Sequence, residues 1–139
     1  MINPLADQYE AWSFGGTTPD MPNILADLVR TGQKTATASA YAFYQFEDSP
    51  LPRVGDYNII LDSDEEAVCI TKTTKVYTTP FCDVSDTHAF KEGEGDKSLA
   101  FWRDSHEHFF ARELQEIGLT FTPDMIVVCE EFEVVYPVK

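Results

Sequence analysis

The sequence predicts an α+β fold in which an antiparallel, barrel-like β-sheet is surrounded by helices. With 139 residues, the chain can bury one hydrophobic core but not two, so we expect a single domain over residues 1–139. The hydrophobic fraction of 43% and the aromatic fraction of 13% are typical of globular proteins. The expected helices and strands do not alternate as a doubly wound parallel sheet requires, which favours an antiparallel arrangement.

The net charge of −14 restricts the possible partners. Lys and Arg hold most phosphate backbones, so we expect no binding of duplex DNA. A local group of cations would still suffice for one nucleotide or small anion, and the candidates are Lys34, Arg53, Lys72, Lys75 and Arg103.

The sequence shows no targeting signal and no cysteine spacing typical of metal sites. No apolar run reaches the roughly 20 residues that cross a bilayer, and residues 1–10 lack a signal pattern, so we expect a cytoplasmic location and no membrane contact. Cys69, Cys82 and Cys129 have no metal-type spacing, and we expect them to be reduced thiols. The pattern leaves the oligomeric state open.

The first half of the chain is expected to hold two helices and a short strand. Leu5, Tyr9 and Trp12 have the spacing of one helical face, which predicts a helix over Pro4–Trp12. A second helix is expected over Met21–Gly32, with Gly32 as its stop. A short strand should follow over Lys34–Ser39. Periodicity does not decide between helix and strand for the aromatic run Tyr41–Phe46.

A hairpin is expected in the middle of the chain. Its strands are Tyr57–Leu61 and Ala67–Thr79, joined by the acidic turn Asp62–Glu66. Strict alternation along the second strand places Lys72 among Val68 and Ile70, on what is expected to be the more apolar face.

The last third should contain two helices and a strand. A short helix is expected over Asp83–Phe90, followed by the acidic loop Glu92–Asp96. Asp96 is expected to cap a long helix over Lys97–Ile117. The chain then closes with a strand over Met125–Val135.

Gly32 to Ser39, with the sequence GQKTATAS, is the first candidate ligand-binding element. A glycine turn here brings an ammonium, Lys34, and a hydroxyl, Thr37, to the start of a strand. Thr37 is a weak nucleophile unless a base takes its proton, and a lysine with a lowered pKa can be that base. The alternative is a helix-capping glycine followed by an exposed lysine.

A second candidate site combines the acidic loop with the helix after it. Glu94 and Asp96 supply carboxylates, Trp102 and Arg103 add an aromatic ring and a guanidinium, and His106 adds an imidazole. The alternative is a helix cap with a core-facing stripe in which Trp102 is buried. Glu130 is either a pocket carboxylate or a solvated glutamate.

No metal and no cofactor are expected. His106 and His108 are two residues apart on a helix, so they point in different directions and cannot form the i, i+4 pair of a helical zinc site.

The sequence resembles the ASCH family of small PUA-like β-barrel domains over nearly its whole length. The resemblance rests on five segments: Trp12–Gly15, Gly32–Ser39, Leu51–Asp56, Glu92–Asp96 with Ser98–Arg103, and Val127–Glu130. It implies a cleft beside the barrel, lined by a G-x-K-x-x-T element and proposed to bind RNA or modified nucleosides. Some members are amidohydrolases that convert acetylcytidine to cytidine, and others are described as ribonucleases.

In the amidohydrolases the lysine and threonine of this element work with a glutamate on a later strand. Those two residues correspond to Lys34 and Thr37, whereas Lys72 stands where the glutamate is expected. Glu94 or Glu130 would then have to replace that carboxylate.

Three functions remain open at this point. The first is noncatalytic binding of RNA, a nucleotide or a modified nucleoside. The second is deacetylation of an N-acylated cytidine by Thr37, Lys34 and either Glu94 or Glu130, and the third is a ribonuclease reaction that uses His106 with Lys34. The expected ligand contacts are Trp12, Ser39, Lys72, Asp96, Trp102, Arg103 and His106.

Overall fold

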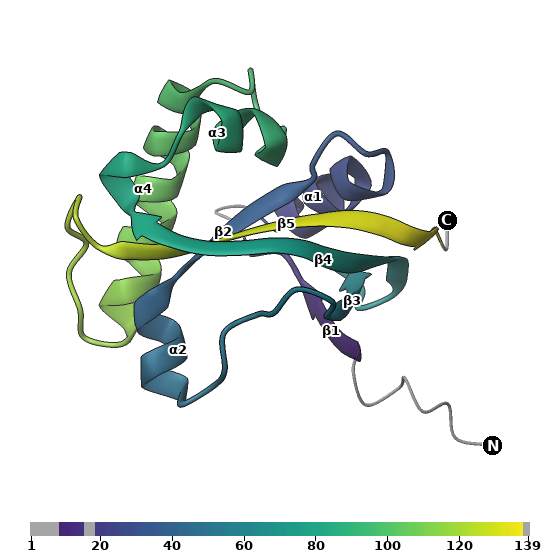
Figure 1. Cartoon of the computed structure of the whole chain (residues 1–139), viewed down its shortest axis with the longest axis horizontal. Coiled ribbons are helices and arrows are strands. Elements are labelled where there is room, and N and C mark those ends of the chain that lie inside the picture. Colours follow the sequence, from purple (N-terminus) through teal and green to yellow (C-terminus); the bar gives the residue numbers. More distant parts are fainter. Residues whose placement is uncertain (1–8, 16–18, 138–139) are drawn as a thin grey trace.

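The fold combines one sheet with four helices (Figure 1). The computed structural model describes residues 9–15 and 19–137. Its elements in chain order are β1 (Tyr9–Ser13), α1 (Met21–Arg30), β2 (Ala36–Ala40), α2 (Tyr41–Glu47), β3 (Tyr57–Leu61), β4 (Ala67–Pro80), the 3-10 turn η2 (Phe81–Asp83), α3 (Asp86–Glu92), α4 (Leu99–Glu116) and β5 (Ile126–Pro137).

The sheet has the strand order β1-β3-β4-β5-β2 and curls into a half-barrel. The β3–β4, β4–β5 and β5–β2 pairs are antiparallel, whereas β1 pairs with β3 in parallel. The expected α+β class is therefore confirmed, but the expectation of an entirely antiparallel sheet is wrong at this one pair. Two helices and a strand separate β1 from β3, which gives the chain enough length for the crossover that parallel pairing needs.

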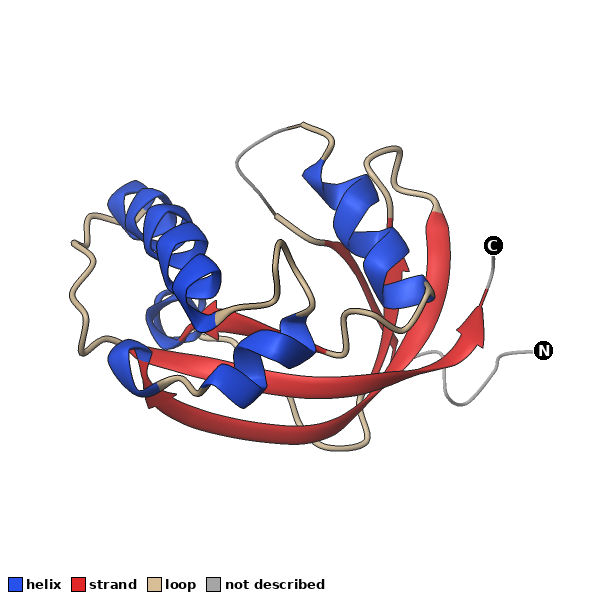
Figure 2. Ribbon diagram, turned by 90° about the horizontal axis from the view of Figure 1, so that it is seen from above, coloured by secondary structure: helices blue, strands red, loops and turns tan. Residues whose placement is uncertain are grey.

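Two hydrophobic clusters hold the helices against the sheet. One forms beneath α4, where Trp102, Phe110 and Leu114 pack with residues that include Phe81 and Val127. The other forms beneath α1 and contains Leu25, Ala26, Val29, Ile60, Cys69 and Phe132. Figure 2 shows α4 and α1 at the two ends of the curled sheet, on the same side of it. The space between the two clusters is where the cavity described below lies.

The helix predicted over Pro4–Trp12 is wrong where it can be checked. Tyr9–Ser13 forms β1, whose register with β3 runs from Tyr9↔Tyr57 to Ser13↔Leu61. Residues 4–8 lie outside the described residues. Helical spacing of three apolar residues is a local signal, and pairing with a distant strand overrides it here.

The remaining elements follow the predictions with shifted ends. The ambiguous aromatic run is the helix α2. Ser85 caps α3, which continues as far as Glu92, so Glu92 lies at the end of a helix rather than in the acidic loop. Ser98, and not Asp96, caps α4 by accepting a hydrogen bond from the Phe101 N–H. Asp96 instead accepts from the Ser98 N–H.

The inner face of β4 differs from the expectation. Cys69, Thr71 and Thr73 are buried, so their face turns inward. Lys72 lies on the opposite face, with its Nζ 5.8 Å from the centroid of the Tyr57 ring. The prediction that Lys72 shares the more apolar, inward face is therefore wrong. The Thr73 hydroxyl is bonded to Glu130, so the inner face of the sheet holds polar as well as apolar side chains.

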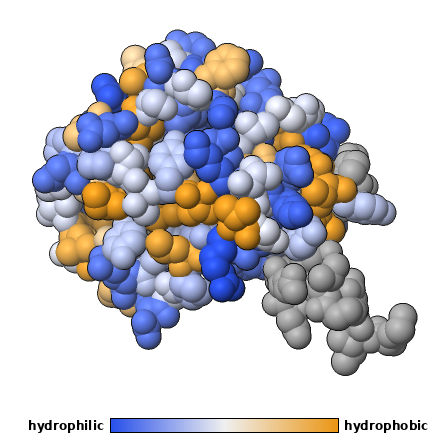
Figure 3. All heavy atoms as spheres, in the orientation of Figure 1, coloured by the Kyte–Doolittle hydropathy of each residue, from blue (hydrophilic) through white to orange (hydrophobic). Residues whose placement is uncertain are grey.

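The cysteines and the surface of the described residues can be compared with the sequence predictions. All three cysteines are free, as predicted, with Cys69 and Cys129 buried. Within the described residues, no helix is long and apolar enough to cross a membrane. Hydrophobic side chains form only a short band across the face seen in Figure 3, among many hydrophilic ones.

Candidate functional site

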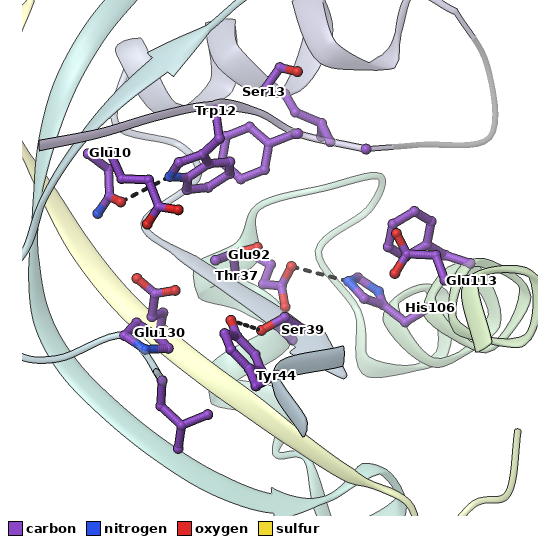
Figure 4. A pocket seen from close by; sticks show the side chains of 18 of the residues that line it. Glu10, Trp12, Ser13, Thr37, Ser39, Tyr44, Glu92, His106, Glu113 and Glu130 are labelled. Atoms are coloured by element: carbon purple, nitrogen blue, oxygen red, sulfur yellow. Dashed lines mark hydrogen bonds and ion pairs between the residues drawn. The ribbon is translucent and has the colours of Figure 1, made fainter. Parts of the chain in front are cut away.

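A cavity of about 520 Å³ lies between the two hydrophobic clusters. Its walls come from β1, α1, β2, α2, β3, α4, β5, the end of α3 and the loop before β3 (Figure 4). The residues with functional side chains on these walls are Glu10, Trp12, Lys34, Thr37, Ser39, Tyr44, Glu47, Arg53, Asp56, Asn58, Glu92, Glu94, His106, Glu113 and Glu130. This size is typical of small-molecule sites.

Lys34 forms a buried ion pair with two carboxylates at one end of the cavity. Its Nζ lies 3.1 Å from Glu92 Oε1 and 2.7 Å from Glu94 Oε2, and its side chain is only 1% exposed. Burial alone would lower the pKa of Lys34, but the charges and hydrogen bonds of Glu92 and Glu94 raise it above its ordinary value. Lys34 is thus held as an ammonium.

A close backbone contact keeps Lys34 in this position. Gly93 has a φ of 70°, and a Cβ at this residue would lie 2.2 Å from the Gln33 carbonyl oxygen. The Gln33 amide also donates to the Gly93 carbonyl. The turn before β2 therefore touches the end of α3, which places Lys34 directly against Glu92.

Glu92 is the centre of the buried network. Its carboxylate accepts hydrogen bonds from Lys34, from His88 Nε2 at 2.7 Å and from Trp102 Nε1 at 2.6 Å. Burial favours the neutral acid, but Lys34 and His106 outweigh it and hold the pKa of Glu92 well below its usual range. A buried carboxylate needs this many donors to remain charged.

His106 adds a second cation to the network. Its Nδ1 lies 2.9 Å from the Trp102 carbonyl oxygen and its Nε2 lies 3.3 Å from Glu92 Oε1. Both oxygens are acceptors, so this geometry favours a hydrogen on each ring nitrogen, as in an imidazolium. Burial lowers the pKa of His106, but Glu92 raises it above the ordinary value. Lys34 and His106 together balance Glu92 and Glu94.

The opposite wall carries hydroxyls and a third buried carboxyl. Thr37 on β2 lies directly across from Glu130 on β5 in the antiparallel register. Thr73 Oγ1 donates to Glu130 Oε2 at 3.0 Å, and the Ser39 and Tyr44 hydroxyls lie 2.8 Å apart. Burial and the nearby charges of Asp56 and Glu10 raise the pKa of Glu130, although the Thr73 hydrogen bond opposes them.

Comparison with known proteins identifies the family. The family model described as ASCH domain matches residues 10–136. This chain belongs to the ASCH domain family.

Two solved structures share its fold. The structure of an ASCH domain from Lactobacillus crispatus is 38% identical, with a TM-score of 0.87, and the match covers 92% of this chain and 80% of that one. A protein from Enterococcus faecalis, assigned to the family model DUF984, is 41% identical with a TM-score of 0.86, and the match covers 92% and 77%. No curated protein matches the chain significantly.

The ASCH fold brings together seven of the residues selected from the sequence. These cavity-lining residues are Trp12, Lys34, Thr37, Ser39, Glu94, His106 and Glu130. Trp12 donates from its Nε1 to Asn58 Oδ1 at 2.9 Å, which fixes the orientation of the indole ring.

Four other candidates do not line this cavity. Lys72 lies on the other face of β4, and Asp96 is exposed at the start of α4. Arg103 is exposed and donates to the Cys82 carbonyl oxygen. Trp102 is 2% exposed and stacks against His106, with ring centroids 4.2 Å apart, so it supports the cavity wall from behind. The structure therefore does not bring Lys72 and Arg103 together with Lys34 in this cavity.

Sequence reasoning missed Glu92, the residue with the most contacts in the site. The spacing of His88 and Glu92, four residues apart, was the available signal, because such pairs meet on one face of a helix. Asn58 and Glu113 were also missed, and their types and spacing give no comparable signal.

Glu92, Glu94 and His106 have the geometry of a metal-binding group, with ligand atoms within 4.8 Å of one another. Lys34 Nζ already contacts both carboxylates, and His106 directs its Nε2 at Glu92. The ammonium of Lys34 thus takes the place that a metal cation would occupy between the two carboxylates.

The charge of His106 predicts a specific pH dependence of stability. Its folded pKa is raised above 6.5, so its contribution to stability is fully present below that value and is lost as pH rises through the folded pKa. We expect the difference in unfolding free energy between the wild type and His106→Gln to be largest below pH 6.5 and to shrink as pH rises through the raised pKa of His106. Urea unfolding at several pH values measures this difference.

The exposed His108 provides the comparison: Asp104 raises its pKa as well, but it lies outside the buried network, so His108→Gln measures the pH dependence that an exposed histidine contributes. A difference for His106→Gln that grows with pH would contradict a charged His106.

Proposed function

We propose that the cleft binds one nucleoside, with its base against the aromatic wall and its ribose near the loop before β3. ASCH domains are generally thought to bind RNA, and a nucleoside is the unit of RNA that a cavity of about 520 Å³ can enclose. The observation that carries this proposal is the combination of aromatic rings with an excess of carboxylates on the cavity wall.

The aromatic part of the wall suits a flat base. Trp12, Phe14, Tyr44 and Phe109 all line the cavity, the first two at the end of β1 and the others in α2 and α4. Stacking on aromatic rings is how proteins usually hold unpaired bases. Asn58, Ser39 and Thr37 add hydrogen-bonding groups on the same walls.

The charges of the wall disfavour phosphate. Lys34 and His106 are engaged with Glu92 and Glu94, as described above. The remaining ionisable side chains on the described walls are Arg53 and the carboxyls of Glu10, Glu47, Asp56, Glu113 and Glu130. A phosphate inside the cavity would therefore meet like charge. This favours a nucleoside over a nucleotide or a length of RNA.

The charge argument predicts how phosphorylation changes affinity. Cytidine and acetylcytidine should bind, and their 5′-monophosphates should bind about tenfold more weakly or worse because of repulsion by the carboxylates. Isothermal titration calorimetry measures both affinities.

Two alanine substitutions test whether the nucleoside binds inside the cavity. Trp12→Ala should weaken nucleoside binding because a stacking surface is lost, whereas Lys72→Ala should not, because Lys72 lies outside the cavity. Tighter binding of the monophosphates, or of a single-stranded RNA with no nucleoside binding, would contradict the proposal.

A second candidate function is the deacetylation of acetylcytidine, supported by the position of Glu130 across from Thr37. Burial raises the pKa of Glu130, which brings this carboxyl closer to the range useful for proton transfer. In this reaction Glu130 takes the proton of Thr37, and Thr37 Oγ1 attacks the acetyl carbonyl carbon. The amide C–N bond then breaks, the leaving amine receives the proton, and water hydrolyses the acetyl-threonine ester to acetate.

Lys34 does not fit the role of base in this reaction, because its ion pairs hold it as an ammonium. A ribonuclease reaction has less support still, since it would need both Lys34 and His106 to exchange protons with the substrate.

The hydrolase reaction predicts cytidine release from acetylcytidine, detected by chromatography. Thr37→Ala and Glu130→Gln should each abolish turnover. Thr35→Ala is the control, because the Thr35 hydroxyl donates to the Lys91 carbonyl and its side chain does not line the cavity. Turnover that survives in Thr37→Ala would exclude this mechanism, and absence of turnover in the wild type would leave binding as the function.

A further inference from the structure

Two carboxyls on opposite walls of the cleft have no cation paired with them among the described residues. Glu113 lies on α4 and Glu130 lies on β5, and Figure 4 shows them on opposite sides of the cavity. Glu130 is 9% exposed. Among the described residues, its side chain accepts a hydrogen bond from the Thr73 hydroxyl and forms no ion pair.

Each of these carboxyls lies among other acids. Asp56 and Glu10 act on Glu130, while Glu116 and Glu47 act on Glu113. Burial and these like charges raise the pKa of both groups. Burying a charged carboxyl away from any cation is unfavourable. A positively charged ligand in the cleft would therefore stabilise the carboxylates of Glu113 and Glu130.

Among the described residues, no cation on the cavity wall forms an ion pair with Glu113 or Glu130. Lys34 and His106 are bound to Glu92, and the side chain of Arg53 is exposed at the loop before β3. In contrast, the carboxylates of Glu92 and Glu94 are neutralised within the protein, because they lie 3.1 and 2.7 Å from the Lys34 ammonium.

The aromatic rings around the cavity favour a flat cation in particular. A positive charge above the face of an aromatic ring is attracted to it, most strongly by Trp. Trp12 and Tyr44 both line the cavity, and their polar atoms are already bonded to Asn58 and Ser39. Their ring faces are thus what they can offer a ligand.

We propose that the cleft prefers a nucleoside whose base carries a positive charge through N-methylation. Such a base is flat, so it stacks on Trp12 and Tyr44, and its charge lies between Glu113 and Glu130. This inference rests on the proposed nucleoside binding and specifies which nucleosides the cleft selects.

Matched pairs of nucleosides test the preference. 3-Methylcytidine and 1-methyladenosine carry a positive base at neutral pH, and cytidine and adenosine are their neutral counterparts. Calorimetric titration of the wild type should give about tenfold or more tighter binding for each methylated member.

Substitutions then assign the preference to the two carboxyls. Glu130→Gln and Glu113→Gln keep the shape of each side chain and remove its charge, so each should reduce the ratio between the affinities for the methylated and the unmethylated nucleoside of a pair. Glu107→Gln is the control, because Glu107 is an exposed residue of the same helix as Glu113 and does not line this cavity. If Glu130→Gln fails to fold, Glu113→Gln still tests the assignment.

The outcomes separate this inference from the proposed function. Equal binding within each pair overturns the charge preference but leaves nucleoside binding intact. A preference that survives both Gln variants overturns the role of Glu113 and Glu130. Failure of all four nucleosides to bind overturns the proposed function together with this inference.

Discussion

The buried ion pair of Lys34 and Glu92 is the interaction on which the rest of the site depends. It joins the turn before β2 to the end of α3, and the indole of Trp102 and the imidazole of His106 attach α4 to the same carboxylate. Removing one partner of such a pair typically costs about 3–5 kcal/mol, because the other charge is left buried without compensation. One carboxylate therefore sets the relative positions of three segments that wall the cleft.

This network also decides which chemistry is available in the cleft. A lysine within a G-x-K-x-x-T element suggests either a base or a phosphate contact, but Lys34 neutralises Glu92 and Glu94 instead. With Lys34 and His106 engaged with Glu92 and Glu94, the other charged side chains on the described walls are Arg53 and five carboxyls, which include Glu113 and Glu130. The same sequence element thus has a structural role at its lysine and faces the ligand cavity at Thr37.

Local patterns in the sequence predicted most of the fold. The strands of the hairpin and the helix α4 have strong local signals, namely an acidic turn between apolar runs and an apolar stripe that buries Trp102, Phe110 and Leu114. β1 was not predicted because its conformation comes from pairing with β3, which is distant in sequence. The side of the sheet on which Lys72 lies was also missed, since β-bulges in β4 and burial of Thr71 and Thr73 are not visible as an apolar pattern. For the site, the turn at Lys34 and Thr37 was predictable, whereas the role of Glu92 depends on three elements meeting in space.

The most direct test of nucleoside binding in the cleft is an NMR titration with cytidine. It measures the chemical-shift changes of the backbone amide and indole N–H signals. If a base enters the cleft, the largest changes will occur at Thr37, Ser39, Glu130 and the indole N–H of Trp12. Signals from Lys72 and Arg103 will stay in place, because these residues lie outside the cavity. The largest changes at Lys72 and Arg103, with Thr37 and Glu130 unaffected, would contradict the account.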